Sequence, residues 1–256
     1  MRNGEHKGVP LRTLTFALLA AALVAVGSAW PAHAATPDLS GSQWDMRQIG
    51  APAARARTTG AGVRIGIVDT GIDAAHEDLA GRTVAFANCV QQACADAAPF
   101  DDNGHGTHVS GIAAAAGNGV GITGVAPGAQ FVVAKVLDSS GGGSVSDVNA
   151  GIHWVVDHGA GVVNLSLGSG TSLLSIFGDN SLSDGVEYAW THGSIAVLAA
   201  GNTNFFGLGS SNYGNAHALV VGATGPGGEV ASYSSPLGNA QWGLVAPGGD
   251  DTNASD

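Results

Sequence analysis

Charged side chains are scarce in this sequence of 256 residues, where Asp, Glu, Lys and Arg together make up 11%. Disordered chains combine high charge with few apolar residues, so this composition, rich in Gly and Ala, indicates a compact domain instead. Basic residues are the scarcest, since nine Lys and Arg stand against 20 Asp and Glu. No basic cluster interleaved with aromatic residues is present, which excludes nucleic acid as an expected partner.

Long hydrophobic runs are also missing, and the one apolar stretch near the N-terminus, 14–26, is short for a membrane span. Three basic residues precede this stretch, and Ala32-His33-Ala34 follows it as a small-x-small cleavage site. The pattern predicts a signal peptide over 1–34, and therefore a secreted, extracellular protein without a stable membrane anchor after cleavage. A retained anchor is the alternative.

Cysteine is limited to Cys89 and Cys94, in the segment N-C-V-Q-Q-A-C. An exported protein meets an oxidising environment, so we expect a disulfide that closes this small loop. A zinc site is the alternative, but it needs further ligands nearby and the loop contains no His.

Five short runs rich in apolar and β-branched residues predict strands. Because the runs are apolar on both faces, they indicate strands covered on both sides, as in a parallel sheet. The runs lie at 63–68, 131–137, 161–167, 195–200 and 219–223.

Helical patterns lie between the predicted strands. Residues 145–158 place four apolar residues on one face behind a cap at Ser144 or Ser146, and 182–192 form a weaker pattern closed by Gly193. Strand and helix in alternation predict an α/β fold, a three-layer open, mainly parallel sheet with helices on both faces. Residues 35–60 are interrupted by Pro and Gly, so we expect them to wrap the surface of the domain formed by 61–256.

The stretch 102–116 reads D-N-G-H-G-T-H-V-S-G-I-A-A-A-A, a turn followed by small residues. A helix with no polar face is expected to be buried on all sides, so His105 would be held rigidly at its mouth, as a general base requires. Two alternatives stay open: His105 as an ordinary hydrogen-bonded polar residue, and His105 with His108 as a metal-binding pair.

Informative residues follow three of the predicted strands: Asp69, the segment Ser166-Leu167-Gly168, and Asn202. Sites in open α/β sheets form at the carboxyl ends of the strands, so we expect these residues to converge with His105. Asp69 would fix the tautomer of His105, and Asn202 would donate to a developing oxyanion, which favours acyl transfer. An Asp that only caps a turn and an Asn in a common Gly-Asn turn are the alternatives.

Two backbone edges, Ser166-Leu167-Gly168 and Gly141-Gly142-Gly143, are expected to bind a peptide added between them as a strand. A flexible loop is the alternative for the glycine run. The Asp-Thr-Gly triplet at Asp69 also occurs in aspartic proteases, but that fold is all-β and needs a second such loop, whereas this sequence has one.

Four segments in this order resemble the subtilisin-like serine proteases (subtilases): V-D-T-G-I-D at Asp69, N-G-H-G-T-H-V-S-G at His105, V-N-L-S-L-G at Ser166, and A-A-G-N at Asn202. The resemblance covers about 44–249 and implies a serine endopeptidase acting as a monomer on extended peptides, with Asp69 and His105 in its triad and Asn202 as oxyanion donor. It also implies structural calcium on the loop A-G-N-G-V-G-I. The implied ligands are the side chains of Asp78 and Asn118 and the carbonyls of Ala116, Val120 and Ile122.

The sequence departs from the family at the nucleophile. The family motif G-T-S-M-A is expected after Ala246-Pro247-Gly248, but the chain as given ends at Asp256. We therefore expect the triad serine to lie beyond Asp256, and this chain by itself to be nearly inactive. Ser172, in Gly170-Thr171-Ser172, precedes Asn202 and is not expected to replace it. An exported peptide-binding pseudoprotease is the alternative function.

Overall fold

The structure is a computed structural model that describes residues 36–91, 93–167, 182–202 and 216–250. The chain divides into two units, Met1–Ala35 and Thr36–Asp256, and all described residues belong to the second. The predicted signal peptide, Gly168 and Ser172 lie outside the described residues. Within the described part, none of the helices has the length and apolar character needed to cross a membrane.

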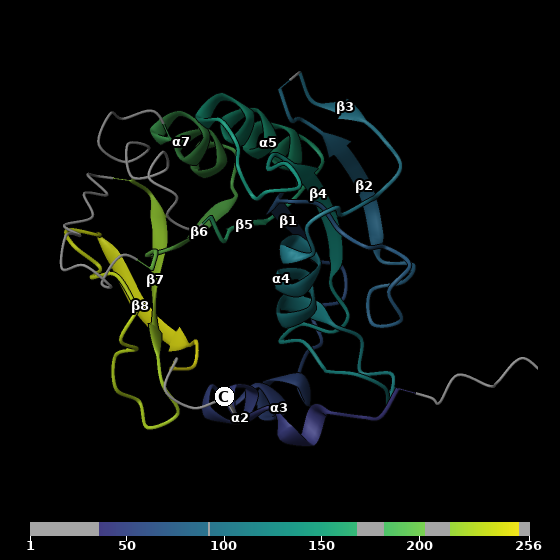
Figure 1. The fold of residues 1–256 in the computed structure, drawn as a ribbon, viewed down its shortest axis with the longest axis vertical. Coiled ribbons are helices and arrows are strands. Elements are labelled where there is room, and N and C mark those ends of the chain that lie inside the picture. The colour runs from purple at the N-terminus through teal and green to yellow at the C-terminus, as the bar shows by residue number, and fades with distance from the viewer. Residues whose placement is uncertain (1–35, 92, 168–181, 203–215, 251–256) are drawn as a thin grey trace, which may run out of the picture. The chain divides into compact units, whose positions relative to one another are not determined.

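The strands of the described residues form one eight-stranded sheet in the order β3-β2-β4-β1-β5-β6-β7-β8 (Figure 1). All neighbouring pairs are parallel except β2 and β3, which are antiparallel. The strands are β1 (Arg64–Asp69), β2 (Thr83–Asn88), β3 (Ala95–Asp96), β4 (Gln130–Lys135), β5 (Val162–Leu165), β6 (Ile195–Ala199), β7 (Ala218–Thr224) and β8 (Trp242–Pro247).

The five predicted strands are confirmed as β1, β4, β5, β6 and β7, whereas β2, β3 and β8 were not predicted. The β2 pairing with β4 shifts register between Thr83 and Ala85, which breaks the sequence pattern. The β8 sequence W-G-L-V-A-P contains Gly and Pro and lies at the edge of the sheet, where its central residues are exposed.

Helices α5 (Val145–Asp157) and α7 (Ser183–Thr191) lie on one face of the sheet, and α4 (His105–Ala114) lies on the other (Figure 1). The Ser144 hydroxyl caps α5 by accepting a hydrogen bond from the Asp147 amide at 3.1 Å. Gly193 follows α7 with a φ of +79°, the left-handed conformation that commonly ends a helix. Both predicted helices are therefore confirmed.

Neighbouring residues of β1 and β4 point into two separate hydrophobic clusters. Val68 and Val132 join the cluster under α5, whereas Ile67 and Val133 join the cluster that includes Ala114 of α4. Because both faces of these strands are covered, β1 and β4 form the centre of a three-layer α/β fold, as predicted.

Within the described residues, the strands β6 and β7 are fully buried on one face only. Leu198 packs in the cluster under α5 and α7, and Val220 on the same face packs against Leu237 and Ala240. Their neighbours Val197 and Leu219 on the opposite face are half-buried. The expectation of strands buried on both sides is thus wrong for β6 and β7. The second face carries the apolar residues that the sequence predicts, but among the described residues these are only half-buried.

The segment before β1 contains short helices that the sequence analysis did not predict. These are η1 (Ser40–Ser42), α2 (Trp44–Gln48) and α3 (Ala51–Arg55). Met46 and Ala51 are its buried apolar anchors. Hydrogen bonds from Leu39 N to Gly121 O (2.7 Å) and from Gly121 N to Pro37 O (2.9 Å) tie the segment to the loop after α4.

Candidate active site

Asp69 and His105 meet at the carboxyl end of β1. Asp69 is the last residue of β1, and its side chain is 0% exposed. His105 is the first residue of α4, its side chain is 46% exposed, and its Nδ1 lies 2.7 Å from Asp69 Oδ1. The structure therefore brings together two residues that the sequence analysis assigned to one site, with the carboxylate buried and the imidazole accessible.

The backbone around Asp69 is held by hydrogen bonds on both sides. The amides of Val136 and Leu137 donate to its carbonyl oxygen at 2.9 and 3.2 Å, and the Thr70 amide donates to its Oδ1 at 2.7 Å. Its Oδ2 is buried and accepts no hydrogen bond from the described residues. Oδ1 thus orients the imidazole, while the negative charge on Oδ2 is not offset by a hydrogen-bond donor of the described residues.

Two glycines allow α4 to begin directly against the end of β1. A Cβ on Gly106 would lie 2.2 Å from the Gly71 carbonyl oxygen, and a Cβ on Gly71 would lie 2.1 Å from the Phe100 carbonyl oxygen. Gly71 also has a φ of +127°, which L-residues rarely adopt. Only glycine at these positions lets the two backbones come close enough for His105 to reach Asp69.

Asp101 organises the backbone that leads into α4. Its carboxylate accepts hydrogen bonds from the Thr70 hydroxyl (2.9 Å), from the amides of Asn103 (3.1 Å) and Gly104 (2.8 Å), and from both the amide (2.9 Å) and the hydroxyl (2.6 Å) of Thr107. Burial alone would raise the pKa of Asp101, but the hydrogen bonds from Thr107, Gly104 and Asn103 outweigh it and lower the pKa to about 2. Asp101 is therefore an anion at neutral pH that fixes the start of the His105 helix.

The pKa of His105 is raised above its ordinary value of 6.5, chiefly by the hydrogen bond to Asp69. Partial burial acts in the opposite direction, and the negative charges of Asp69 and Asp101 favour the protonated ring. A base whose proton affinity is increased by a fixed carboxylate is suited to accept a proton near neutral pH.

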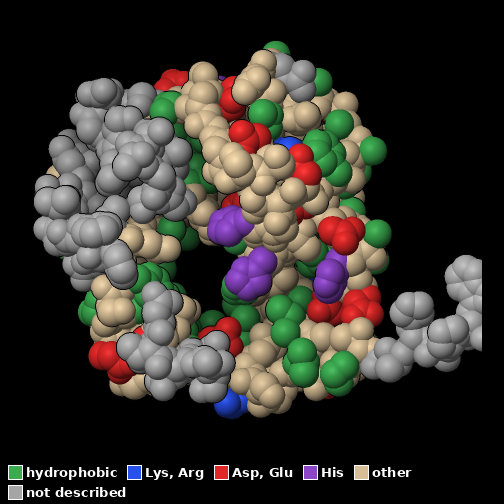
Figure 2. Space-filling view, viewed as in Figure 1, with side chains coloured by type: hydrophobic (Ala, Val, Ile, Leu, Met, Phe, Trp, Pro, Cys, Tyr) green, Lys and Arg blue, Asp and Glu red, His purple; other side chains and the backbone are tan. Residues whose placement is uncertain are grey.

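The helix that carries His105 is not buried on all sides, which corrects the sequence-based expectation. Gly106, Ser110 and Ala114 are buried on one side of α4, but His105 and Ile112 are exposed on another. Figure 2 shows this face of the molecule hollowed beside α4, with histidine side chains along the edge of the hollow. A run of small residues permits close packing on any side, so it does not indicate which side is covered.

The described residues do not support the alternative metal sites. Among them, no three or more His, Cys, Asp and Glu side chains are grouped so that they hold a metal ion, at His105 and His108 or elsewhere. Cys89 and Cys94 form the predicted disulfide.

The backbone edge Gly141–Gly143, which is expected to bind a peptide, belongs to an ordered turn over 138–143 that we call the groove edge. Asp138 accepts hydrogen bonds from the Ser140 amide (2.8 Å), the Ser140 hydroxyl (2.6 Å) and the Gly142 amide (3.0 Å). Asn103, two residues before His105, donates from Nδ2 to the Ser139 carbonyl at 3.1 Å. The edge is thus fixed to the segment that positions His105, which argues against a free loop.

The remaining predicted residues follow β5, which neighbours β1 in the sheet, and β6, which neighbours β5. Ser166 and Leu167 follow β5 and are half-buried, and the Ser166 hydroxyl accepts a hydrogen bond from Asn164 Nδ2 at 2.9 Å. Asn202 is exposed beyond the end of β6. The described contacts join neither Ser166 nor Asn202 to His105, so their roles stay predictions, as does the role of Gly168.

The predicted calcium ligands lie together around Asp78, which is 3% exposed. Among the described residues, its carboxylate accepts the Ile122 amide at 3.1 Å and the Asn118 side-chain amide at 3.3 Å, while the Ala116 amide donates to the Asp78 carbonyl at 2.9 Å. A buried carboxylate with acceptor capacity left, wrapped by a loop rich in carbonyl groups, has the oxygen chemistry that calcium prefers. The residues present therefore fit the ion.

Comparison with known proteins agrees with this geometry, because a family model described as the subtilase family matches residues 60–256. The chain belongs to the subtilase family. This subtilase is 41% identical to thermitase of Thermoactinomyces vulgaris over 202 residues, which cover 78% of the chain and 68% of that protein. It is 40% identical to subtilisin Savinase of Lederbergia lenta over 208 residues, which cover 80% of the chain and 71% of that protein. For an alkaline protease of Shouchella clausii the identity is also 40%, but only 50% of that protein is covered.

Sequence reasoning on this subtilase missed two residues of the site, Asp101 and Lys135. The signal for Asp101 was its place before N-G-H-G, where an Asp commonly accepts hydrogen bonds from a helix start. The signal for Lys135 was a charge inside an otherwise apolar predicted strand.

Proposed function

We propose that this subtilase is a secreted serine endopeptidase that hydrolyses peptide bonds through an Asp-His-Ser triad. The observation that carries the proposal is the 2.7 Å contact between His105 Nδ1 and the fully buried carboxylate of Asp69. Membership in a family of serine endopeptidases supports the same chemistry.

In this proposal His105 is the general base. A carboxylate only accepts hydrogen bonds, so the proton of the neutral imidazole lies on Nδ1 and faces Asp69. Nε2 is then free to take the proton of the attacking hydroxyl and later to return it to the leaving amine. Asp69 stabilises the imidazolium that forms between these two steps.

The nucleophilic serine is proposed to lie beyond Asp256, after the segment Ala246-Pro247-Gly248. Two surfaces of the described residues support a further element at this site: the exposed side of α4 with Ile112, and the half-buried face of β6 and β7. An apolar helix end placed there would remove both surfaces from water and bring a hydroxyl toward His105.

Substrate binding is proposed to use backbone groups. The ordered edge Gly141–Gly143 and the segment Ser166-Leu167-Gly168 would pair with a peptide in an extended conformation, and Asn202 would donate its amide to the developing oxyanion. Backbone pairing gives affinity with little sequence choice, so the substrates would be unfolded or extended protein segments.

Calcium is proposed as a structural ion. The carboxylate of Asp78, the side-chain oxygen of Asn118 and the carbonyls of Ala116, Val120 and Ile122 would hold it, and the ion would neutralise a buried charge and stiffen the loop after α4. Calcium added to the metal-free protein is expected to raise its Tm, and Asp78→Asn is expected to abolish that increase. An equal increase in the variant would refute the assignment of this site.

The proposed activity is tested on the natural secreted product. Its intact mass and C-terminal peptides show whether the chain continues past Asp256, and a fluorophosphonate probe labels an activated serine. A longer, labelled product that cleaves casein, and whose His105→Ala variant is neither labelled nor active, supports the peptidase. A product that is unlabelled and inert but still binds extended peptides would refute it in favour of a pseudoprotease.

A further inference from the structure

Lys135 is a buried cation at the edge of the candidate site. The sequence contains only two lysines, Lys7 and Lys135. Lys135 is the last residue of β4, and its side chain is 3% exposed. Burial of an ammonium group costs free energy unless all of its N–H groups are hydrogen-bonded. The groups that accept these hydrogen bonds are therefore the ones whose positions Lys135 fixes.

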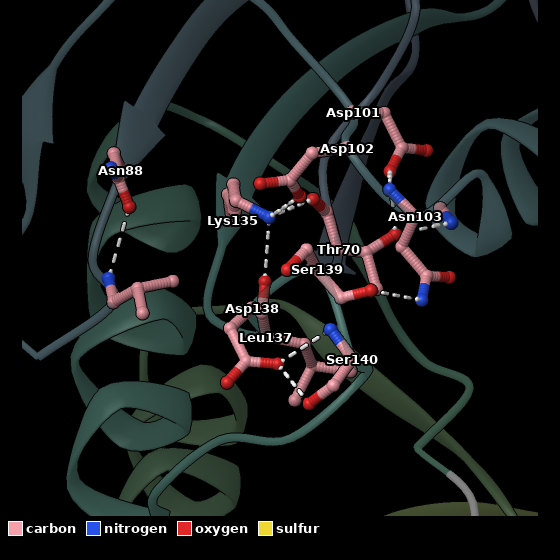
Figure 3. A network of polar contacts seen from close by, with 12 residues as sticks. Thr70, Asn88, Asp101, Asp102, Asn103, Lys135, Leu137, Asp138, Ser139 and Ser140 are labelled. Atoms are coloured by element: carbon pink, nitrogen blue, oxygen red, sulfur yellow. Dashed lines mark hydrogen bonds and ion pairs between the residues drawn. The ribbon is translucent and has the colours of Figure 1, made fainter.

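The ammonium has three partners, one for each of its donors (Figure 3). Nζ donates to the Thr70 carbonyl at 2.7 Å, to the Leu137 carbonyl at 2.7 Å and to Asp102 Oδ1 at 2.5 Å. The ring of Phe100 lies 5.2 Å away, within the range of a cation–π contact. The hydrogen-bonding capacity of the group is therefore used completely.

The three partners come from three segments with different parts in the site. Thr70 directly follows Asp69, Asp102 lies in the turn that leads to His105, and Leu137 precedes the turn that forms the groove edge. Figure 3 shows the side chain of Lys135 between these segments, with the dashed contacts spreading from its nitrogen. One cation thus links the acid, the base and the expected peptide-binding edge.

We propose that Lys135 is a positioning residue that fixes the Asp69–His105 pair relative to the groove edge at 138–143. This inference rests on the proposed peptidase function, because only that function gives the relative placement a consequence. Lys135 touches no reacting atom and acts through the backbone of Thr70 and Leu137.

The backbone contacts carry this argument more than the ion pair does. Asp102 is 45% exposed, so its carboxylate can turn to water when the cation is removed. The carbonyls of Thr70 and Leu137 belong to the backbone and would be left without a hydrogen-bond donor. We expect the two segments to move until these carbonyls find another donor. Leu137 also donates its amide to the Asp69 carbonyl, so its displacement reaches the acid directly.

The burial of the ammonium is tested first, with a readout that needs no activity. Lys7→Arg leaves Lys135 as the only lysine among the 256 residues given, so [15N]lysine labelling of this chain gives a single side-chain signal. We expect a protonated amine with slow hydrogen exchange that resists acylation by an N-hydroxysuccinimide ester until the protein is unfolded. Rapid acylation of the folded protein would overturn the proposal.

The positioning role is tested next, by following the NMR titration of His105 in Lys135→Met. Loss of a nearby positive charge alone would raise the His105 midpoint, whereas displacement of Asp69 would weaken its hydrogen bond and lower the midpoint. We expect the midpoint to fall; a midpoint that rises or does not move would refute the role. Arg82→Met is the matched control, because Arg82 also donates to two backbone carbonyls, those of Asp78 and Pro127, away from the dyad.

Kinetics of the natural protein complete the test. Lys135→Met is expected to lower kcat/KM by about 10- to 100-fold, the loss typical of a misplacement near 1 Å. Lys135→Arg keeps the charge but presents a planar fork, so we expect partial rescue and an intermediate His105 midpoint. If Lys135→Met does not fold, the Arg variant decides, since a midpoint and a kcat/KM equal to those of the unmodified protein would refute the role. An inert unmodified protein would instead refute the peptidase, while the lysine and His105 signals would still report on the placement.

Discussion

The two halves of the sheet differ in how they are completed. Around β1 and β4 both faces are covered. Short hydrogen bonds of Asp69 and Asp101 join the ends of the strands to α4, and those of Lys135 join them to the turn before it. On β6 and β7 one face is as well buried as any core, while Leu219 and its neighbours on the other face are half-buried. The half around β1 and β4, which holds Asp69 and His105, is therefore cross-linked by hydrogen bonds, and we call it the braced half. The half around β6 and β7, which is expected to receive the nucleophile, has a half-buried apolar face.

The largest expected effect lies in the braced half. Asp69→Asn keeps the size of the side chain but replaces an acceptor by an amide, so the neutral imidazole of His105 turns its proton the wrong way. We expect kcat of the natural protein to fall by about 10⁴-fold, the loss typical of removing the carboxylate of a triad. Asp73→Asn, four residues later on the exposed surface, is the matched control and is expected to stay within about twofold of the unmodified protein.

Steady-state hydrolysis of a chromogenic peptide, with circular dichroism to verify folding, measures both variants. A folded Asp69→Asn protein that retains more than a tenth of the activity would contradict the role of Asp69 and remove the main functional distinction between the two halves.

The braced half was also the more predictable one. Strands such as β1 and β4 are apolar on both faces, and the Ser144 cap and apolar stripe of α5 are local signals, so neighbouring residues alone determine them. The meeting of Asp69 and His105 followed from the rule that parallel strands end at one edge of the sheet. The disulfide followed from two cysteines close together in a chain that the sequence predicts to be exported.

The features that the sequence did not predict depend on contacts between distant segments. The edge strand β8 reads W-G-L-V-A-P, and its exposed residues and Gly give no clear alternation. The small residues of α4 fit against any neighbour, so their pattern did not distinguish its covered side from its exposed side. Lys135 receives its three partners from three loops, and no spacing within the sequence records that arrangement.

The next largest effect is expected from the two faces of β6 and β7, which differ in how deeply their side chains are buried. Leu198 on β6 is 2% exposed beneath α5 and α7, whereas Leu219 on β7 lies on the half-buried face. Leu198→Ala is expected to reduce the free energy of unfolding by about 3 kcal/mol through lost burial and a cavity. Leu219→Ala is expected to cost about 1 kcal/mol in this chain, because its side chain still contacts water.

Urea unfolding of the two variants at equal protein concentration gives the difference. Equal losses would show that the second face of β7 is covered as well as the first, which would abolish the distinction between the halves. If the natural product continues past Asp256, the cost of Leu219→Ala is expected to rise toward that of Leu198→Ala in the longer protein.

A smaller effect is expected at Asp101. Its pKa is lowered to about 2 from 3.8, so its stabilising contribution is present above pH 3.8 and is lost as the pH falls through the lower value. After allowance for its partial exposure to solvent, Asp101→Asn is expected to cost about 1–2 kcal/mol at pH 7. Asp38→Asn is the control, since the pKa of Asp38 is also lowered but the group is fully exposed at the surface.

Denaturant unfolding at pH 7 and near pH 2.5 measures this contribution. The difference between Asp101→Asn and the unmodified protein is expected to shrink at the lower pH, and the Asp38 variant is expected to show the smaller difference at pH 7. A difference that grows toward acid would show that the hydrogen bonds from Thr107 and Gly104 do not favour the ionised carboxylate.

The smallest expected effect is the pH dependence of His105. Its pKa is raised above 6.5 chiefly by the hydrogen bond to Asp69, so the general base loses its proton only above that pH. We expect the acid limb of kcat/KM to have its midpoint above 6.5, and Asp69→Asn to move the remaining limb to lower pH. The stability linked to His105 has the opposite trend: it is fully present below 6.5 and is lost as the pH rises through the raised pKa.

The unfolding free energies of His105→Ala and of the unmodified protein, measured across this pH range, test that linkage, with His108→Ala as the control on the same helix. The loss caused by His105→Ala is expected to be larger at pH 5.5 than at pH 8.5. An equal loss at both pH values would mean that the Asp69 contact does not favour the charged ring. The braced half would then be held by its backbone hydrogen bonds and not by the charge interaction between Asp69 and His105. In that case the two halves of the sheet would not differ in electrostatic stabilisation.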